Sequence, residues 1–311
     1  MSQQHSAPQQ HSAPQQRCVS QQRRVSQQRR VGRGGMLMET RFDEQGIVRA
    51  NKPVGAGLYL MELEAEKTAH SIAPGQFVHL RLPRMEAHIL RRPFSIYSAT
   101  PENATIEILY QCVGFGTAHL SELLVGEVLD VMGPLGNTWH TPDSAERALL
   151  VGGGVGAAPL FMLAEELLGK GIAFDVVLGA QRKDALVCRT RFEALFMGGS
   201  VHAFSLAHAN STLFCATDDG SFGHGGFCTE LSKDLLSKQA YDYMAVCGPE
   251  PMMRIAVQQA LECDTPCEVS LEKRMACGVG ACLSCVVDTS EGKKRSCVDG
   301  PVFDARKVVF A

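Results

Sequence analysis

The sequence lacks an apolar run long enough to cross a bilayer. The nearest candidate, Ala148–Ala164, is uncharged for seventeen residues, but it contains Pro159 and several glycines and is short for a membrane helix. Residues 1–35 also lack the apolar core of a secretory signal peptide. We therefore expect a reducing, cytoplasmic environment, where clustered cysteines bind metal or do redox chemistry rather than form disulfides.

Acidic residues are missing from residues 1–35, which contain six arginines. The rest of the chain has 24 basic residues (30 − 6) against 33 acidic ones, a net charge of about −9, which argues against general nucleic-acid binding. The first 35 residues repeat "QQHSAP" and "SQQRRV" and contain too little apolar sequence for a core. We predict a disordered low-complexity tail; a transit peptide, or translation starting at Met36 or Met38, is the alternative.

The remaining chain divides by pattern into three parts. Residues 36–143 contain short apolar runs separated by Gly, Pro and Asn, which predicts a small antiparallel β-barrel. Residues 146–265 alternate buried strands with amphipathic helices, which predicts a parallel α/β domain. Residues 266–311 have too little apolar sequence for an independent core. We therefore expect their folded structure to depend on packing against the other domains or on a bound cluster.

A glycine-rich motif stands at the start of the α/β domain. In "LLVGGGVGAAP", Gly152, Gly154 and Ala157 satisfy G-x-G-x-x-A between a strand and a helix, which suits phosphate binding. The usual acidic ribose residue after the second strand is missing, and Gln181, Arg182 and Lys183 stand there instead. A turn that only packs helix on sheet is the alternative.

The motif "CGPEPMM" ends a later strand of the same domain. Ligands bind at the carboxyl edge of parallel sheets, so Cys247 is placed to face a nicotinamide. A buried small residue explains it equally well, because most free cysteines are of that kind.

Two motifs in the barrel are candidates for binding a diphosphate. In "RRPFSIYS", Arg92 suits charge-assisted hydrogen bonds to phosphate, and Ser95 offers a hydroxyl. In "VGFGTAHL", Gly114, Gly116 and Thr117 form a second plausible phosphate cradle. Each motif is weak alone, and their occurrence ahead of an α/β domain gives them weight.

Four of the twelve cysteines are clustered near the end of the sequence. Cys277, Cys282, Cys285 and Cys297 follow C-x4-C-x2-C-x11-C, an arrangement typical of a [2Fe–2S] loop with one distant ligand. Zinc, or no metal, stays open on spacing alone. The other ungrouped cysteines are expected to be packing or surface residues: Cys18, Cys112, Cys188, Cys215, Cys228, Cys263 and Cys267.

The motifs together resemble the ferredoxin-reductase superfamily and, within it, the electron-transfer subunits of dihydroorotate dehydrogenase B. The resemblance covers about residues 36–311 and rests on "RRPFS", "GFGT", "LLVGGGVGAAPL", "ATDDGSFGHGGF", "CGPEPMM" and "MACGVGACLSC…SCVDGPVFDA". It implies FAD in the barrel, NAD at the α/β domain and a [2Fe–2S] cluster in the C-terminal segment.

The resemblance also implies particular site residues. Those for FAD are Arg92, Pro93, Phe94, Ser95, Leu109, Tyr110, Gln111, Gly116 and Thr117. Those for NAD are Gly152, Gly154, Gly156, Cys247 and Gly248, with Thr217–Ser221 near the nucleotide. The cluster ligands implied are the four clustered cysteines.

The implied activity is electron transfer in pyrimidine biosynthesis. A partner subunit oxidises dihydroorotate on its own FMN, electrons cross singly through the cluster to FAD, and a hydride passes to NAD+. The assembly implied is a heterotetramer with two of each subunit. No Ser/His/Asp or paired-carboxylate motif stands out, and no catalytic residue is predicted. The alternatives are an FAD/[2Fe–2S] subunit of an NAD(P)H–ferredoxin transhydrogenase or sulfide dehydrogenase and, more distantly, a non-enzymatic zinc-binding regulator.

Overall fold

The first part of the described chain forms one antiparallel sheet. The computed structural model describes residues 41–85, 89–197 and 210–310, so the expectation for residues 1–35 lies outside it. The strands pair in the order β4-β3-β7-β1-β2-β6-β5. Their bounds are β1 (Phe42–Gly55), β2 (Leu58–Glu64), β3 (Phe77–Arg81), β4 (Arg92–Ser95), β5 (Ser98–Thr100), β6 (Thr105–Gln111) and β7 (Val128–Leu135).

This sheet curls until its two ends meet. Phe94 on the terminal strand β4 lies edge-on to Tyr110 on β6, with ring centroids 5.8 Å apart. Alternate side chains, such as Val78 and Leu80, fill the enclosed core. Short helices pack against it: α1 (Glu66–Ser71), η1 (Pro101–Asn103) and α2 (Phe115–Ser121). The expected antiparallel barrel is confirmed.

The second sheet is parallel except at one edge. Its order is β11-β10-β9-β8-β12-β13-β16, and only β13 and β16 pair antiparallel. The strands are β8 (Arg147–Gly153), β9 (Ala173–Ala180), β10 (Thr212–Thr217), β11 (His224–Gly225), β12 (Tyr243–Cys247), β13 (Cys267–Ser270) and β16 (Val302–Asp304). The helical segments are η2 (Gly154–Leu160), α3 (Phe161–Gly169), η3 (Lys183–Ala185), α4 (Arg189–Phe196), α6 (Cys228–Lys238) and α7 (Glu250–Glu262).

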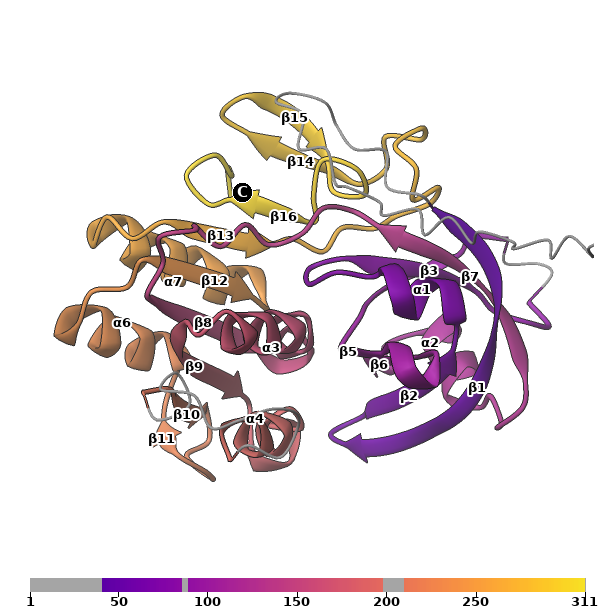
Figure 1. Cartoon of the computed structure of the whole chain (residues 1–311), viewed down its shortest axis with the longest axis horizontal. Helices are drawn as coiled ribbons and strands as arrows, with labels where there is room; N and C mark the ends of the chain where they lie inside the picture. Colours follow the sequence, from indigo (N-terminus) through magenta and orange to yellow (C-terminus); the bar gives the residue numbers. More distant parts are fainter. Residues whose placement is uncertain (1–40, 86–88, 198–209, 311) are drawn as a thin grey trace, which may run out of the picture. The chain divides into compact units, whose positions relative to one another are not determined.

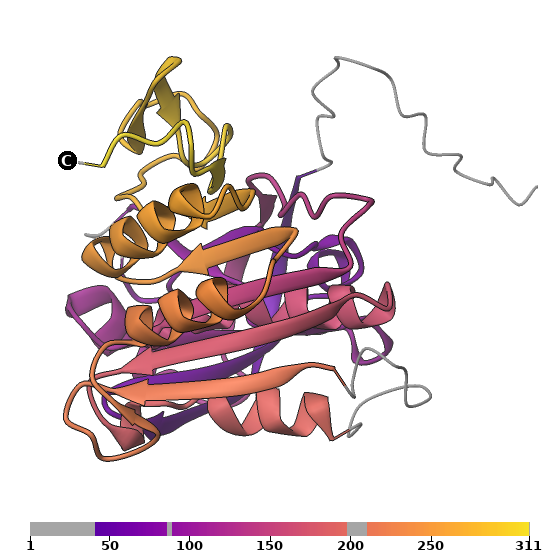
Figure 2. The same ribbon diagram turned by 90° about the vertical axis from the view of Figure 1, so that its left-hand side faces the viewer.

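Helices cover both faces of this sheet. Helices α3 and α4 lie on one face and α6 and α7 on the other (Figure 1). In Figure 2 the orange helices α6 and α7 cross the face turned to the viewer. Neighbouring residues of β8 point to opposite faces of the sheet: Leu150 packs in the core on the α3 side, and Leu149 packs in the core on the α7 side. The expected parallel α/β domain is confirmed.

The uncharged run Ala148–Ala164 is divided among β8, η2 and the start of α3. The glycine-rich motif in this run was expected to stand between a strand and a helix, and a 3-10 turn directly follows the strand. The α-helix itself begins later, at Phe161, because Pro159 has no N–H to donate and the preceding glycines favour a tighter turn. Among the described residues, no helix is long and apolar enough to span a membrane.

The C-terminal segment is built into the rest of the fold. Between β13 and β16 it forms a hairpin of β14 (Val286–Thr289) and β15 (Gly292–Arg295). Asn137, at the end of the barrel, exchanges two hydrogen bonds with the Val302 backbone, at 2.8 and 3.0 Å. The expected dependence of this segment on its neighbours follows from these contacts.

Candidate functional site

The three barrel motifs expected to bind a flavin come together in space. Arg92 lies against the start of α2, where a Cβ on Gly116 would be 2.7 Å from the arginine Nε. Phe94 meets Tyr110, whose ring stacks on Tyr59 at 5.6 Å. Thr117 Oγ1 accepts hydrogen bonds from the N–H groups of Val113 and Gly114 and so fixes the loop before α2.

These residues offer the chemistry that a flavin dinucleotide needs. The guanidinium of Arg92 suits a diphosphate, and the aromatic rings and the Ser95 hydroxyl suit a flavin ring. Pro93, Phe94 and Ser95 are half-buried with Arg92, and Gln111 is exposed at the strand end. Leu109, Tyr110 and Gly116 are buried, and Thr117 is half-buried. The donor set fits FAD, and the contact of each residue with it stays a prediction.

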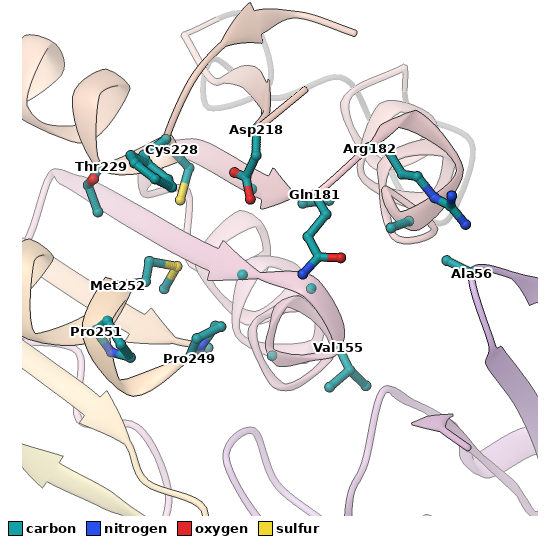
Figure 3. Close-up of a pocket in the computed structure, with 18 of the residues that line it drawn as sticks. Ala56, Val155, Gln181, Arg182, Asp218, Cys228, Thr229, Pro249, Pro251 and Met252 are labelled. Carbon is teal, nitrogen blue, oxygen red and sulfur yellow. The ribbon is translucent and has the colours of Figure 1, made fainter. Parts of the chain in front are cut away.

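A pocket of about 720 Å³ opens at the carboxyl edge of the parallel sheet. Figure 3 shows Gln181 and Asp218 reaching into it from the ends of β9 and β10, with Pro249 and Met252 on the other side. Ala56 and Gln111 of the barrel also line it, so the pocket reaches from the sheet edge to the strand end expected to contact a flavin. This is the position at which α/β sheets bind nucleotides.

The glycine-rich motif shapes the floor of the pocket. Gly154 has φ +56° and nothing within 4 Å of an added Cβ, so its backbone is open to a ligand. Gly156 packs tightly, because its Cβ would lie 2.6 Å from Gly248 Cα. Both glycines and Gly248 line the pocket, whereas Gly152 packs behind it, 2.8 Å from Ala157 Cα by the same measure.

Cys247 lies behind the pocket wall rather than on it. Its side chain is 1% exposed, and burial, with the nearby Glu272, raises the pKa of its thiol well above the ordinary value. Glu272 does line the pocket; its side chain is solvent-accessible but deeply surrounded by protein, and desolvation raises its pKa. The predicted contact of Cys247 with a nicotinamide stays a prediction.

An acidic side chain enters the pocket from the end of β10, the strand beside β9. The motif Thr217–Ser221 follows β10, and its Asp218 lines the pocket beside Gln181. The Ser221 hydroxyl accepts a hydrogen bond from the Lys183 N–H at 2.9 Å, which ties this turn to the end of β9. The resemblance placed this motif near the nucleotide, but the sequence gave no signal for several other wall residues, among them Ala56, Cys228, Thr229 and Glu272.

The four clustered cysteines lie as two pairs. The thiol of Cys277 lies beside that of Cys282, and the thiol of Cys297 lies beside that of Cys285. All four are free thiols. The described side chains contain no group of three or more His, Cys, Asp or Glu arranged around one metal ion. In a [2Fe–2S] cluster each of the two irons is bound by two cysteine sulfurs. The two cysteine pairs therefore fit such a cluster.

Backbone N–H groups lie close to the sulfurs of Cys277 and Cys297. Val279 donates to Cys277 Sγ at 3.4 Å, and Gly280 donates to Cys297. Burial alone raises the pKa of Cys277, but the N–H groups of Val279, Cys282 and Ala281, together with the Cys282 side chain, bring it down to about 6. A thiolate is the form that binds iron.

The buried pair packs on the barrel. Cys285 and Cys297 are at most 2% exposed and share a small core with Phe77 and Leu135. Cys282 is exposed, and the apolar side chains of the same loop, Val279 and Leu283, are 40% and 63% exposed. One side of residues 277–297, called the cysteine segment below, therefore faces the barrel, and the other side is accessible. Of the ungrouped cysteines, Cys188, Cys228 and Cys267 are buried, Cys112 and Cys215 intermediate and Cys263 exposed, whereas Cys18 lies outside the described residues.

Three family models match the chain in the same order as these sites. The oxidoreductase FAD-binding domain matches residues 47–140, and the oxidoreductase NAD-binding domain matches residues 150–258. The iron-sulfur cluster binding domain of dihydroorotate dehydrogenase B matches residues 272–309.

Curated relatives match over most of their length. An electron transfer subunit of dihydroorotate dehydrogenase B (NAD+) from Desulforamulus reducens is 37% identical, over 83% of this chain and 94% of its own. The protein of the same name from Streptococcus pneumoniae is 39% identical, over 85% and 97%.

Solved structures show the same fold. An NADH-dependent reduced ferredoxin-NADP oxidoreductase structure superposes with a TM-score of 0.72 at 29% identity, covering 85% of this chain and 89% of the other. An Amycolatopsis cytochrome P450 reductase reaches 0.60 at 20% identity, covering 72% and 67%, and shows the fold alone.

Proposed function

Because this chain belongs to the family of electron transfer subunits of dihydroorotate dehydrogenase B, we propose that it carries electrons between a dihydroorotate-oxidising partner and NAD+ in pyrimidine biosynthesis. The partner proposed is an FMN-containing catalytic subunit, in a heterotetramer with two of each chain. One observation carries the proposal: the cysteine pairs and the nucleotide pocket both lie against the same barrel, through Phe77 and Gln111.

Each site has a defined task in this proposal. When bound, the cluster supplies one-electron exchange and FAD supplies conversion between one- and two-electron chemistry. Arg92, with Gly116 and Thr117 beside it, binds the FAD diphosphate, and Ser95 with the strand end Leu109–Gln111 orients the flavin ring. The cysteine pairs hold the two irons, and the N–H donors stabilise the charge on their sulfurs.

The nucleotide pocket is proposed to prefer NAD over NADP. Gly154 lets the backbone approach the diphosphate, and Gly156 packs closely on Gly248 to form the pocket floor beside it. Asp218 is placed to accept hydrogen bonds from a ribose and would repel a 2′-phosphate. Arg182, the nearby cation, is paired with Asp184 at 2.7 Å.

The partner is proposed to dock at the cysteine segment. The exposed side chains of Val279 and Leu283 make the loop around Cys282 apolar and accessible, which suits a protein partner. The proposed compartment is the reducing cytoplasm; in support, all eleven cysteines of the described chain are free thiols.

The test is reconstitution with and without an intact cluster site. Purified chain is examined for iron, FAD and a visible spectrum, then mixed with an FMN-type catalytic subunit and assayed for dihydroorotate-dependent NAD+ reduction. Cys282→Ser should keep FAD and NADH oxidation by ferricyanide but lose electron exchange with the partner. Cys263→Ser, at an exposed cysteine outside the set, should behave as wild type.

A second candidate function is supported by the ferredoxin-NADP oxidoreductase likeness at 29% identity. In that case the chain would serve an NAD(P)H–ferredoxin transhydrogenase or a sulfide dehydrogenase. Activity with ferredoxin or polysulfide, and none with the dihydroorotate-oxidising partner, would select it. Zinc in place of iron and flavin would contradict both functions.

A further inference from the structure

Strand β3 of the barrel carries a buried histidine whose polar atoms have no partner in the described chain. His79 is 0% exposed, and neither Nδ1 nor Nε2 has a hydrogen-bond partner there. Its neutral ring carries one N–H donor and one acceptor. Leaving a buried donor unpaired is costly, so the ring requires a partner that the described polypeptide does not supply.

The alternation of β3 shows which way the ring faces. Val78 and Leu80 point into the barrel core, so Phe77 and His79 project from the opposite face of the strand. Phe77 packs there against Cys285 and Cys297, and its ring centroid is 5.7 Å from that of His79. His79 therefore faces the cysteine segment.

The ring lies directly against the loop that begins at Cys277. A Cβ on Gly278 would be 2.9 Å from both Cε1 and Nδ1 of His79. Met132, the register partner of His79 on β7, closes the same space, with its terminal methyl 3.1 Å from that position. Only the missing side chain of Gly278 lets an imidazole edge approach the loop so closely.

The other neighbour of His79 is the predicted flavin motif. On β4, Pro93 is its register partner, and this residue stands between Arg92 and Phe94. The histidine thus lies on the strand shared by the two predicted cofactor sites. A bound cluster, inside the loop that the ring already touches, is the absent group best placed to accept its hydrogen bond.

We propose that His79 is a positioning residue for the cluster, whose ring N–H donates a hydrogen bond to a sulfur of the cluster–cysteine unit. This inference rests on the proposed function to the extent that the segment binds a [2Fe–2S] cluster. Reduction adds one negative charge to the cluster, and a donor at sulfur stabilises that charge, so His79 raises the reduction potential. The donor also fixes the loop at Gly278 relative to the barrel.

The test compares His79→Leu and His79→Gln with the control Leu80→Met, which alters a buried side chain of the same strand that faces the barrel core. The potential of the cluster in the purified subunit is measured by redox titration followed by electron paramagnetic resonance (EPR). His79→Leu should shift the one-electron equilibrium about tenfold against reduction, which is about 59 mV. His79→Gln, which keeps an N–H, should restore much of this, and Leu80→Met should show little shift.

A second measurement detects the contact between His79 and the cluster directly in the wild-type protein. Pulsed EPR on reduced wild-type protein labelled with ¹⁵N-histidine should show a nitrogen coupling, absent from His79→Gln. A wild-type cluster without that coupling overturns the inference. A His79→Leu potential equal to that of Leu80→Met also overturns it, and this is the result expected if a buried water satisfies the ring. A wild-type subunit without iron would instead contradict the proposed function.

Discussion

Substitution of Gly156 tests whether close backbone packing forms the nucleotide pocket. An alanine Cβ at this position would lie 2.6 Å from Gly248 Cα, 2.7 Å from Gly248 N and 2.9 Å from the Cys247 carbonyl carbon. All three are backbone atoms and cannot rotate away. Carbon atoms pack at about 3.5 Å or more, so η2 and the end of β12 must separate by about 0.9 Å (3.5 − 2.6).

The expected cost of Gly156→Ala has two parts. Overpacking of this kind destabilises a protein by about 1–3 kcal/mol. Gly156 and Gly248 both line the pocket, so the same displacement misplaces the nucleotide. A shift of nearly 1 Å costs up to about 100-fold in rate, and we expect kcat/KM for NADH to fall about 10- to 100-fold.

The assay is NADH-dependent ferricyanide reduction together with thermal unfolding. The control is Gly169→Ala at the end of α3, where an added Cβ meets nothing within 4 Å and φ is not in the left-handed range. That variant should match wild type or be more stable by up to about 1 kcal/mol. If Gly156→Ala matches Gly169→Ala in both assays, the close approach does not shape the pocket.

Two further predictions concern charge. Asp218→Asn should raise KM for NADH about tenfold, because it loses a charge-assisted hydrogen bond worth about 1.5 kcal/mol. The same substitution should reduce the preference of the pocket for NADH over NADPH. The control Asp234→Asn, on the exposed side of α6, should change neither property. His140 Nδ1 donates a hydrogen bond to the Glu268 carboxylate, which raises the pKa of the imidazole in spite of its partial burial. Stability from this pair, whose histidine is exposed, should therefore be present below about pH 6.5 and lost as the pH rises through the folded pKa. In thermal unfolding, His140→Gln should be less stable than wild type by up to about 1 kcal/mol at pH 5.5 and by less at pH 8. An equal difference at both pH values would contradict the assignment.

Local sequence patterns predicted the barrel, the parallel sheet and the motifs, because each depends on near neighbours in the chain. Alternating residues in "TIEILYQ" became β6, and "AFDVVLGA" became β9. The spacing of Cys277, Cys282 and Cys285 and the glycines between them were also local signals.

What the sequence could not predict depends on contacts between distant segments. Nothing near Val302 indicates that it pairs with Ser270 in a sheet, or that Asn137 bonds to it. The alternation around His79 predicts that it shares a face with Phe77, but not that this face meets the loop at Gly278. Cys228 and Thr229, at the start of α6, line the nucleotide pocket because strand order decides which segments are neighbours.

The cysteine segment is inserted between two adjacent strands of the nucleotide-binding sheet, β13 and β16. Its two ends are therefore held together by sheet hydrogen bonds, and a cluster bound inside it would close the same loop a second time. Iron loading and sheet integrity are then linked, since a ligand that binds only the folded form stabilises whatever must be folded to bind it. The chain without iron should therefore have a looser β13–β16 edge than the iron-loaded chain.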